Sequence, residues 1–383
     1  MVIFRKSRIR FFDTPLALLC LFLCLSNSWG LSAQGLIFDA YAIREGLSNR
    51  LVSDIEVDEL GLIWLATGNG LNRFDGYEFV TFSNSQKIPQ INRLSQSNIK
   101  DIAQSPDNRL LVFFEDLYSS FDIFDPKSFE VKKVEVTLQI EGQARNFFVD
   151  GAGNVFVVSK SDNFTAVSVY DYDLQSFTEV CRLSEHWDRQ YPLIDILVDS
   201  HGKVVLYDEE HGLRTWRPDT KEVKYNDQTI TGQSLNTKDL TILYEDQNRK
   251  IWLAFRNIPG LFNLKGEADS LQLYSGISVD HDYGDVWEDN SGNLIFSQAD
   301  INGNFPFSTQ LFCLSKEGEV FDFSHLLEVG NYILSLHSKD FFRTIFIGTD
   351  TGLKVVQNTT TRLQRYISQR IGEDQRGYSM RGI

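Results

Sequence analysis

Clusters of acidic residues and histidines are the first features of this chain that could do chemistry. The segment Asp280–Asp285 reads Asp-His-Asp-Tyr-Gly-Asp and holds the densest set of possible metal ligands. Its spacing departs from the calcium loop of helix-loop-helix proteins, because Gly284 stands where that loop needs an acidic or amide side chain. Glu209, Glu210 and His211 form a second cluster between two expected strands. We interpret both clusters as solvated loops and predict no metal site and no cofactor.

Sequence motifs for catalysis are absent. None of the six histidines is followed by the Glu and Pro typical of a phospho-acceptor helix. The sequence also has no glycine-rich nucleotide loop, no Gly-x-Ser-x-Gly elbow and no His-Glu-x-x-His helix. We therefore predict that this segment is not an enzyme.

The chain does contain a repeat in which a short turn precedes an apolar run, most clearly from Asp58 to Thr67. The positions equivalent to Trp64 follow at steps of 47, 45, 49, 47, 43 and 51 residues and are Leu111, Phe156, Val205, Trp252, Ile295 and Phe346. A strand-rich period of this size is typical of a β-propeller. We predict an all-β fold, a seven-bladed β-propeller of four-stranded antiparallel blades, over residues 34–368.

An acidic residue begins the turn in six of the seven copies. These residues are Asp58, Asp150, Asp199, Asp246, Asp289 and Asp340, with Ser105 in the remaining copy. An Asp at a turn accepts hydrogen bonds from the backbone N–H groups just ahead of it. One copy, Asp150-Gly151-Ala152-Gly153, is similar to the Asp-box of sialidases. A residue repeated in nearly every blade indicates a structural role, since a catalytic residue is needed once.

The N-terminus has the composition of a signal peptide. A basic leader precedes the apolar run Leu16–Leu25, and Leu31-Ser32-Ala33 offers a small-residue cleavage site. The alternative is an uncleaved anchor, but the apolar run is about half of the ~20 residues that span a membrane. We predict that residues 1–33 are a signal peptide and that the chain is exported to the periplasm. The mature part keeps two cysteines, Cys181 and Cys313, which we expect to be buried or free thiols.

The net charge of the chain restricts the classes of partner that it can bind. The formal net charge is −15, and a chain this acidic lacks the clustered Lys and Arg that nucleic acids and anionic membranes require. We therefore predict no nucleic-acid partner for this segment.

The first copy carries a family resemblance. Residues Asp54–Phe79, with Ile43–Asn49 ahead of them, closely resemble the two-component regulator propeller repeat. This repeat builds the periplasmic sensor region of hybrid two-component sensors, especially in Bacteroidetes. Repeats four, five and seven support the resemblance, whereas repeats two, three and six diverge in sequence and match mainly in their spacing along the chain. The resemblance implies a ligand-sensing propeller for a carbohydrate or another nutrient-derived molecule, with signalling through the geometry of a homodimer.

The two ends of the repeat region add expectations. Phe38–Tyr41 is similar to the last strand of a blade, and we predict that it completes the seventh blade. Residues 369–383 are interpreted as the start of a second, truncated propeller. The resemblance places a membrane helix and an output module, such as a histidine kinase, beyond residue 383, so membrane contact is expected only through those parts.

Ligands of propellers usually meet one rim, formed by the loops between second and third strands and by the connections between blades. The polar candidates in these loops are Asn69, Asp116, Asp162, Glu210, Arg256, Asp300 and Asp350. The connection Ser83–Asn98 is a candidate cover for that rim or for a neighbouring subunit. Two alternatives stay open. A catalytic propeller, such as a glycan hydrolase or lyase, needs an acidic pair, or a Tyr with Arg residues, on one rim; a passive protein-interaction scaffold needs a broad apolar face.

Overall fold

The computed structural model describes residues 36–115, 117–184, 193–199, 201–208, 212–225, 229–230, 233–234, 240–255, 258–265, 270–274, 281–300, 310–323, 332–340 and 343–358. The predicted signal peptide (1–33) and the predicted further repeat (369–383) lie outside these residues. The chain divides into a large unit, residues 38–357, and a small unit of residues 1–37 and 358–383. Of the small unit, only residues 36, 37 and 358 are described, at the ends of two strands.

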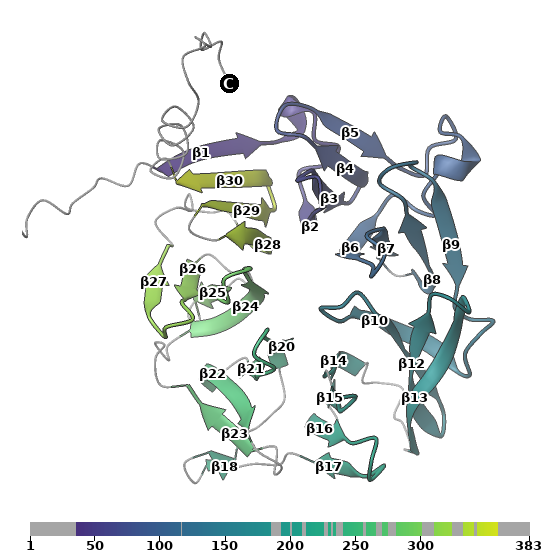
Figure 1. Cartoon of the computed structure of the whole chain (residues 1–383), viewed down its shortest axis with the longest axis vertical. Helices are drawn as coiled ribbons and strands as arrows, with labels where there is room; N and C mark the ends of the chain where they lie inside the picture. The colour runs from purple at the N-terminus through teal and green to yellow at the C-terminus, as the bar shows by residue number, and fades with distance from the viewer. Residues whose placement is uncertain are drawn as a thin grey trace, which may run out of the picture. The chain divides into compact units, whose positions relative to one another are not determined.

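In the described part of the chain, the large unit is a ring of seven antiparallel sheets with four strands each (Figure 1). The predicted seven-bladed β-propeller is therefore confirmed. In blades 1 to 6 the strands pair in chain order, and the first strand of each blade lies nearest the centre of the ring.

The strands of the blades have the following bounds. Blade 1 is β2 (Val52–Val57), β3 (Ile63–Thr67), β4 (Gly70–Phe74) and β5 (Phe79–Phe82); blade 2 is β6 (Ile99–Gln104), β7 (Leu110–Phe114), β8 (Leu117–Phe124) and β9 (Val131–Glu135). Blade 3 is β10 (Gln143–Val149), β11 (Val155–Ser161), β12 (Phe164–Asp171) and β13 (Ser176–Ser184); blade 4 is β14 (Leu193–Val198), β15 (Val204–Asp208), β16 (Gly212–Trp216) and β17 (Val223–Tyr225). Blade 5 is β20 (Leu240–Glu245), β21 (Ile251–Phe255), β22 (Ile258–Lys265) and β23 (Ser270–Leu273); blade 6 is β24 (His281–Glu288), β25 (Leu294–Asp300), β26 (Gln310–Leu314) and β27 (Val320–Asp322). Blade 7 is β28 (Ile333–Asp340), β29 (Thr344–Thr349), β30 (Gly352–Asn358) and β1 (Leu36–Tyr41). Between blades 4 and 5 lies the short hairpin of β18 (Thr229–Ile230) and β19 (Gln233–Ser234).

The recurring Asp holds the turn between the first and second strands of its blade. Asp58 Oδ1 accepts hydrogen bonds from the backbone N–H groups of Leu60 and Leu62, both at 2.9 Å. Its Oδ2 accepts a hydrogen bond from the indole Nε1 of Trp64, also at 2.9 Å. Asp246 repeats the arrangement with Trp252 at 2.8 Å. The structural role predicted for this residue is confirmed in these two blades.

Blade 5 keeps the same turn without glycine. The amide of Arg249 donates to the carbonyl of Asp246 at 2.7 Å, as the amide of Gly61 does to Asp58 in blade 1. Arg249 adopts a φ of 62°, in the left-handed region that favours glycine. Blade 5 therefore keeps this turn at a cost of about 1–2 kcal/mol of backbone strain.

Hydrophobic cores lie between neighbouring blades, because the second strands are covered on both faces. Every residue of β3, β7 and β21 is buried, as their unbroken apolar runs predict. Successive side chains of one strand point to opposite faces. Leu110 and Val112 accordingly pack in the core shared with blade 1, and Leu111 packs in the core shared with blade 3.

The N-terminal strand closes the ring. β1 lies beside β30 as the outermost strand of blade 7, which confirms the prediction for Phe38–Tyr41 (Figure 1). Gly352, at the start of β30, has a φ of 139°, and a Cβ there would lie 2.2 Å from the carbonyl oxygen of Tyr41. Only glycine permits this close approach of β30 to β1.

The connection Ser83–Asn98 packs on blade 2 of its own chain. Within it, η2 (Gln90–Asn92) places the Asn92 amide 2.7 Å from the carbonyl oxygen of Phe129, and Leu94 is buried in the core between blades 1 and 2. The side chain of Ser95 and its backbone N–H both donate to the buried carboxylate of Asp122. Among the described residues, no helix is long and apolar enough to cross a membrane.

Candidate functional site

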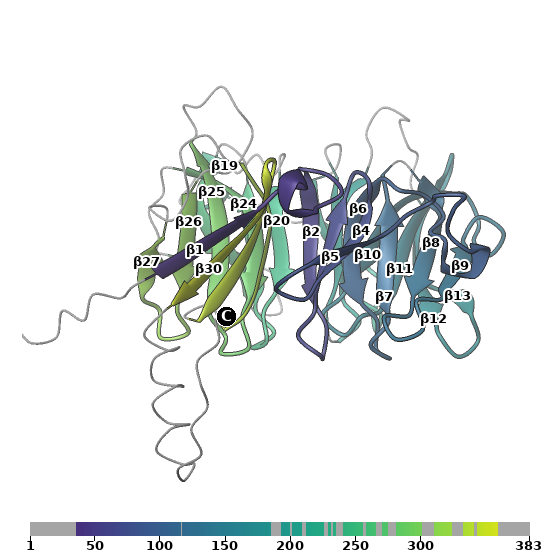
Figure 2. The same cartoon turned by 90° about the horizontal axis from the view of Figure 1, so that it is seen from above.

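The ring has two rims, which Figure 2 shows from the side. We call the rim with the turns between first and second strands, and between third and fourth strands, the turn rim. We call the opposite rim, with the loops between second and third strands and the connections between blades, the loop rim. The strand bounds place each polar side chain on one of them.

The sequence-predicted binding residues lie on the loop rim, as their spacing predicts. Asn69, Asp162 and Asp350 occupy the loops after β3, β11 and β29, and Asp300 is the last residue of β25. Asp116, Glu210 and Arg256 lie outside the described residues, as does the side chain of Asp300. The side chains of the cluster Asp280–Asp285 and the whole of Glu209–His211 are outside them too.

Two of the described loop-rim candidates have structural partners. The Asn69 amide donates to the carbonyl oxygen of Ser48 at 3.2 Å. Asp350 Oδ1 accepts a hydrogen bond from the backbone N–H of Tyr332 at 3.1 Å. These contacts fasten the loops and the connection between blades. Binding by the seven candidates stays a prediction.

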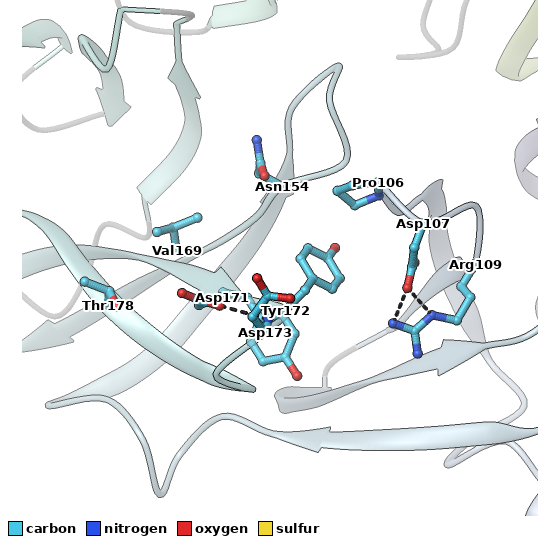
Figure 3. A pocket seen from close by; sticks show the side chains of 10 residues that line it. Pro106, Asp107, Arg109, Asn154, Val169, Asp171, Tyr172, Asp173 and Thr178 are labelled. Carbon is cyan, nitrogen blue, oxygen red and sulfur yellow. Dashed lines mark hydrogen bonds and ion pairs between the residues drawn. The ribbon is translucent and has the colours of Figure 1, made fainter.

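A cavity of about 700 Å³ lies on the turn rim, between blades 2 and 3 (Figure 3). Its lining consists of residues from the first turn of blade 2, from the first turn of blade 3 and from the second turn of blade 3 with the strands beside it. These residues are Pro106, Asp107, Arg109, Asn154, Val169, Tyr170, Asp171, Tyr172, Asp173 and Thr178. None of the predicted candidates lines this cavity. Its volume is in the range of small-molecule sites, about 300–1,000 Å³.

An ion pair between Asp107 and Arg109 forms one wall of the cavity (Figure 3). Arg109 donates to Asp107 Oδ2 from Nε at 2.8 Å and from Nη2 at 2.6 Å. Asp107 Oδ1 accepts a hydrogen bond from the Ser105 hydroxyl at 2.6 Å. Burial opposes ionisation of Asp107, but these hydrogen bonds outweigh it and hold the pKa of the carboxyl below its usual value. The Asp107 carboxylate is therefore ionised at neutral pH, and both of its oxygens already accept hydrogen bonds from the protein.

Tyr170 and Tyr172 form the part of the cavity wall that blade 3 contributes. The Tyr170 ring is 3% exposed and packs in the core between blades 2 and 3. Tyr172 packs edge-on against it, with ring centres 5.1 Å apart, and its hydroxyl donates to the carbonyl oxygen of Gly153 at 2.7 Å. Burial raises the pKa of both hydroxyls, and the Asp107 carboxylate raises that of Tyr172 further. Both tyrosines are therefore neutral at physiological pH.

The remaining polar lining comes from two turns of blade 3. Asp171 Oδ1 accepts hydrogen bonds from the backbone N–H groups of Asp173 and Leu174, both at 2.9 Å. The Asn154 amide nitrogen donates to Asp150 Oδ2 at 2.8 Å. Asp173 and Thr178 are exposed at the mouth. The cavity thus combines fixed aromatic rings with several groups that can donate or accept hydrogen bonds.

No metal centre or reactive thiol occurs in the described part of the chain. No group of three or more His, Cys, Asp or Glu side chains there could hold a metal ion. Cys181 and Cys313 are buried thiols outside any disulfide, as predicted. Burial, with a smaller contribution from Asp289, raises the pKa of Cys313 to about 12.

Repeat-based reasoning missed the cavity because its residues differ from blade to blade. Arg109 follows the turn of blade 2, the one copy in which Ser105 replaces the usual Asp. The run Tyr170-Asp171-Tyr172-Asp173 alternates aromatic and acidic residues at the end of a third strand, which no other blade does. Both departures from the repeat were visible in the sequence.

Comparison with known proteins gives one sequence match and several matches of fold. No family model matches the chain. A segment of 65 residues is 37% identical to histidine kinase P4 of Formosa agariphila and covers 17% of this chain and 5% of that protein.

The fold matches solved propellers of different functions. The extracellular domain of the hybrid two component system BT3049 from B. thetaiotaomicron matches with a TM-score of 0.59 at 16% identity, over 84% of this chain and 42% of that one. The extracellular domain of BT4673 from the same organism matches with a TM-score of 0.57 at 17% identity, over 84% and 43%. Virginiamycin B lyase from Staphylococcus aureus also matches, with a TM-score of 0.57 at 7% identity, over 84% and 99%. This chain therefore spans less than half of these two extracellular domains, and at these identities the likeness concerns the fold.

Proposed function

We propose that this propeller is the ligand-sensing domain of a periplasmic two-component signalling protein. It binds a carbohydrate or another nutrient-derived molecule and does not transform it. The proposal rests on two matches taken together, one of fold and one of sequence. The ring shares its fold with extracellular domains of two-component systems, and part of the chain shares 37% identity with a histidine kinase.

The residues of the cavity support binding over catalysis. A general acid or base needs a pKa near the working pH. The pKa of Asp107 is lowered within its ion pair, and those of Tyr170 and Tyr172 are raised. No histidine lines the cavity. Tyr and Arg residues, which a lyase requires on one rim, are present here, but the raised pKa values of Tyr170 and Tyr172 disfavour a tyrosinate base.

Transmission of the signal is proposed to involve pairs of subunits. Tightly packed interiors do not deform gradually, so a ligand is better read out by a discrete change in packing between rigid bodies. We place this change at a homodimer interface, with the output module in parts of the protein beyond residue 383. The export of the chain by residues 1–33 belongs to the same proposal.

Thermal-shift screening of the purified chain against oligosaccharides and other nutrients tests this function. A ligand present at 100 times its dissociation constant stabilises the folded state by about 2.7 kcal/mol. We expect at least one saccharide to raise the unfolding midpoint in a concentration-dependent way. A folded chain that no member of the panel stabilises would contradict the proposed role.

A further inference from the structure

We propose that the cavity between blades 2 and 3 binds an uncharged saccharide unit and discriminates against acidic sugars. This assignment rests on the sensing function proposed above, and adds the place of binding and the charge of the ligand. It puts the ligand on the turn rim, opposite the loops that the sequence favours.

Tyr170 is the central observation. Its ring is fixed by Phe121, Tyr172 and Phe177, with ring centres 5.7, 5.1 and 5.2 Å away. The residue is 3% exposed and lines the cavity, and its hydroxyl has no hydrogen-bond partner among the described residues. A rigid side chain that presents a neutral hydroxyl to a cavity can donate to or accept from a ligand at little entropic cost.

Other lining groups have hydrogen-bonding capacity that the protein leaves unused within the described part of the chain. Arg109 uses Nε and Nη2 on Asp107, so Nη1 remains as a donor. Asn154 uses its amide nitrogen on Asp150, so Oδ1 remains as an acceptor. Asp171 uses Oδ1 on the turn amides, so Oδ2 remains as a second acceptor. In Figure 3, Arg109 lies at the right of the view, Asn154 at the top and Asp171 at the left.

This pattern suits a polyhydroxylated ring. Each sugar hydroxyl both donates and accepts, so it can pair with a guanidinium, an amide oxygen and a carboxylate on different sides. A volume of about 700 Å³ admits a ligand larger than one sugar ring.

Charge excludes acidic sugars. The lining holds three carboxylates, Asp107, Asp171 and Asp173, and one guanidinium, Arg109, which leaves two negative charges. Two further charged groups interact electrostatically with lining residues: the Asp150 carboxylate with Tyr172, and the Lys132 ammonium with Arg109. Their opposite charges cancel. A uronate carboxylate bound near Asp171 would be repelled by the like charge, which in a partly buried site costs several kcal/mol at contact distance. We expect at least a tenfold preference for the neutral sugar.

Isothermal titration of the whole chain tests the assignment. The probes are neutral disaccharides built from common hexoses and pentoses, and the uronic acid disaccharides that match them. Tyr170→Phe removes one hydroxyl and keeps the packed ring, so the variant should fold. We expect this variant to bind the best neutral probe about three- to tenfold more weakly, as loss of one neutral hydrogen bond implies. Tyr77→Phe is the matched control, because it removes an exposed hydroxyl elsewhere on the turn rim and should leave binding unchanged.

The outcomes separate the site from the function. If a neutral saccharide binds and Asp162→Asn on the loop rim weakens it while Tyr170→Phe does not, the cavity assignment is wrong and the sensing function stands. If uronic acids bind as well as neutral sugars, the charge argument is overturned. If no probe binds a folded chain, the site and the proposed function fail together.

Discussion

Replacing Asp58 by Ala should destabilise the propeller far more than the same change at Asp75. Both carboxylates accept hydrogen bonds from two backbone N–H groups, at 2.9 Å in each case. Asp58 is 6% exposed and also accepts a hydrogen bond from the indole of Trp64, which is completely buried. Asp75 is exposed, so water can replace its carboxylate.

The magnitude follows from the donors left behind. A hydrogen bond to a charged group contributes about 1.5–3 kcal/mol, and a buried donor without a partner costs about 1–3 kcal/mol. The Trp64 indole cannot reach water, and the two turn amides are partly screened from it. We therefore expect Asp58→Ala to lower the free energy of unfolding by about 3–5 kcal/mol. We expect about 0.5–1 kcal/mol for Asp75→Ala.

Equilibrium urea unfolding followed by far-ultraviolet circular dichroism measures both values, since it does not depend on Trp64 as a fluorophore. Trp64→Phe and the double variant complete a mutant cycle, in which we expect the Asp58–Trp64 pair to be coupled by at least 1 kcal/mol. The reasoning would be refuted if Asp58→Ala cost no more than Asp75→Ala, or if the cycle showed no coupling.

The remaining predictions concern charge, closure and the thiols. Burial, and after it the Asp101 carboxylate, raises the pKa of Asp54, so the folded state keeps a proton that the unfolded state releases; this stability is present below about pH 4 and is lost as the pH rises through the folded pKa. Asp101→Asn should therefore raise the free energy of unfolding in urea by about 1 kcal/mol at pH 8 and by less at pH 5, and an equal change at both pH values would contradict this. Gly352→Ala should cost at least 2–3 kcal/mol because its Cβ would meet the Tyr41 carbonyl, whereas Gly61→Ala, with open space around it, should cost only about 1–2 kcal/mol; equal midpoints in chemical denaturation would disprove the closure argument. Cys181 and Cys313 should resist a thiol reagent at pH 8 in the folded chain and react at once in urea, and fast labelling without urea would contradict their burial.

The fold was predictable because its determinants repeat along the sequence. Asp58 and Asp246 share one turn chemistry, and Trp64 and Trp252 occupy equivalent strands, so seven imperfect copies reinforce each other. Phe38–Tyr41 was recognisable as an unpaired last strand for the same reason.

The candidate site was not predictable in the same way. It depends on where the blades differ, and on which polar groups remain available after the protein has satisfied its own hydrogen bonds. Asn69 and Asp350 show the difficulty, since each is a polar residue in a predicted binding loop and each is used to fasten that loop. The free hydroxyl of Tyr170 is evident only once its ring is seen packed between two blades.

The most direct test of the sensing account measures binding and the fate of the ligand in one sample. The purified chain is incubated with the best saccharide from the screen, and saturation of the chain by the saccharide is followed by titration. The molecular mass of the recovered saccharide is then measured by mass spectrometry. The account predicts saturable binding with one site per chain and a saccharide of unchanged mass after prolonged incubation. A shortened, hydrated or unsaturated product would show that the propeller is an enzyme, and would contradict the account.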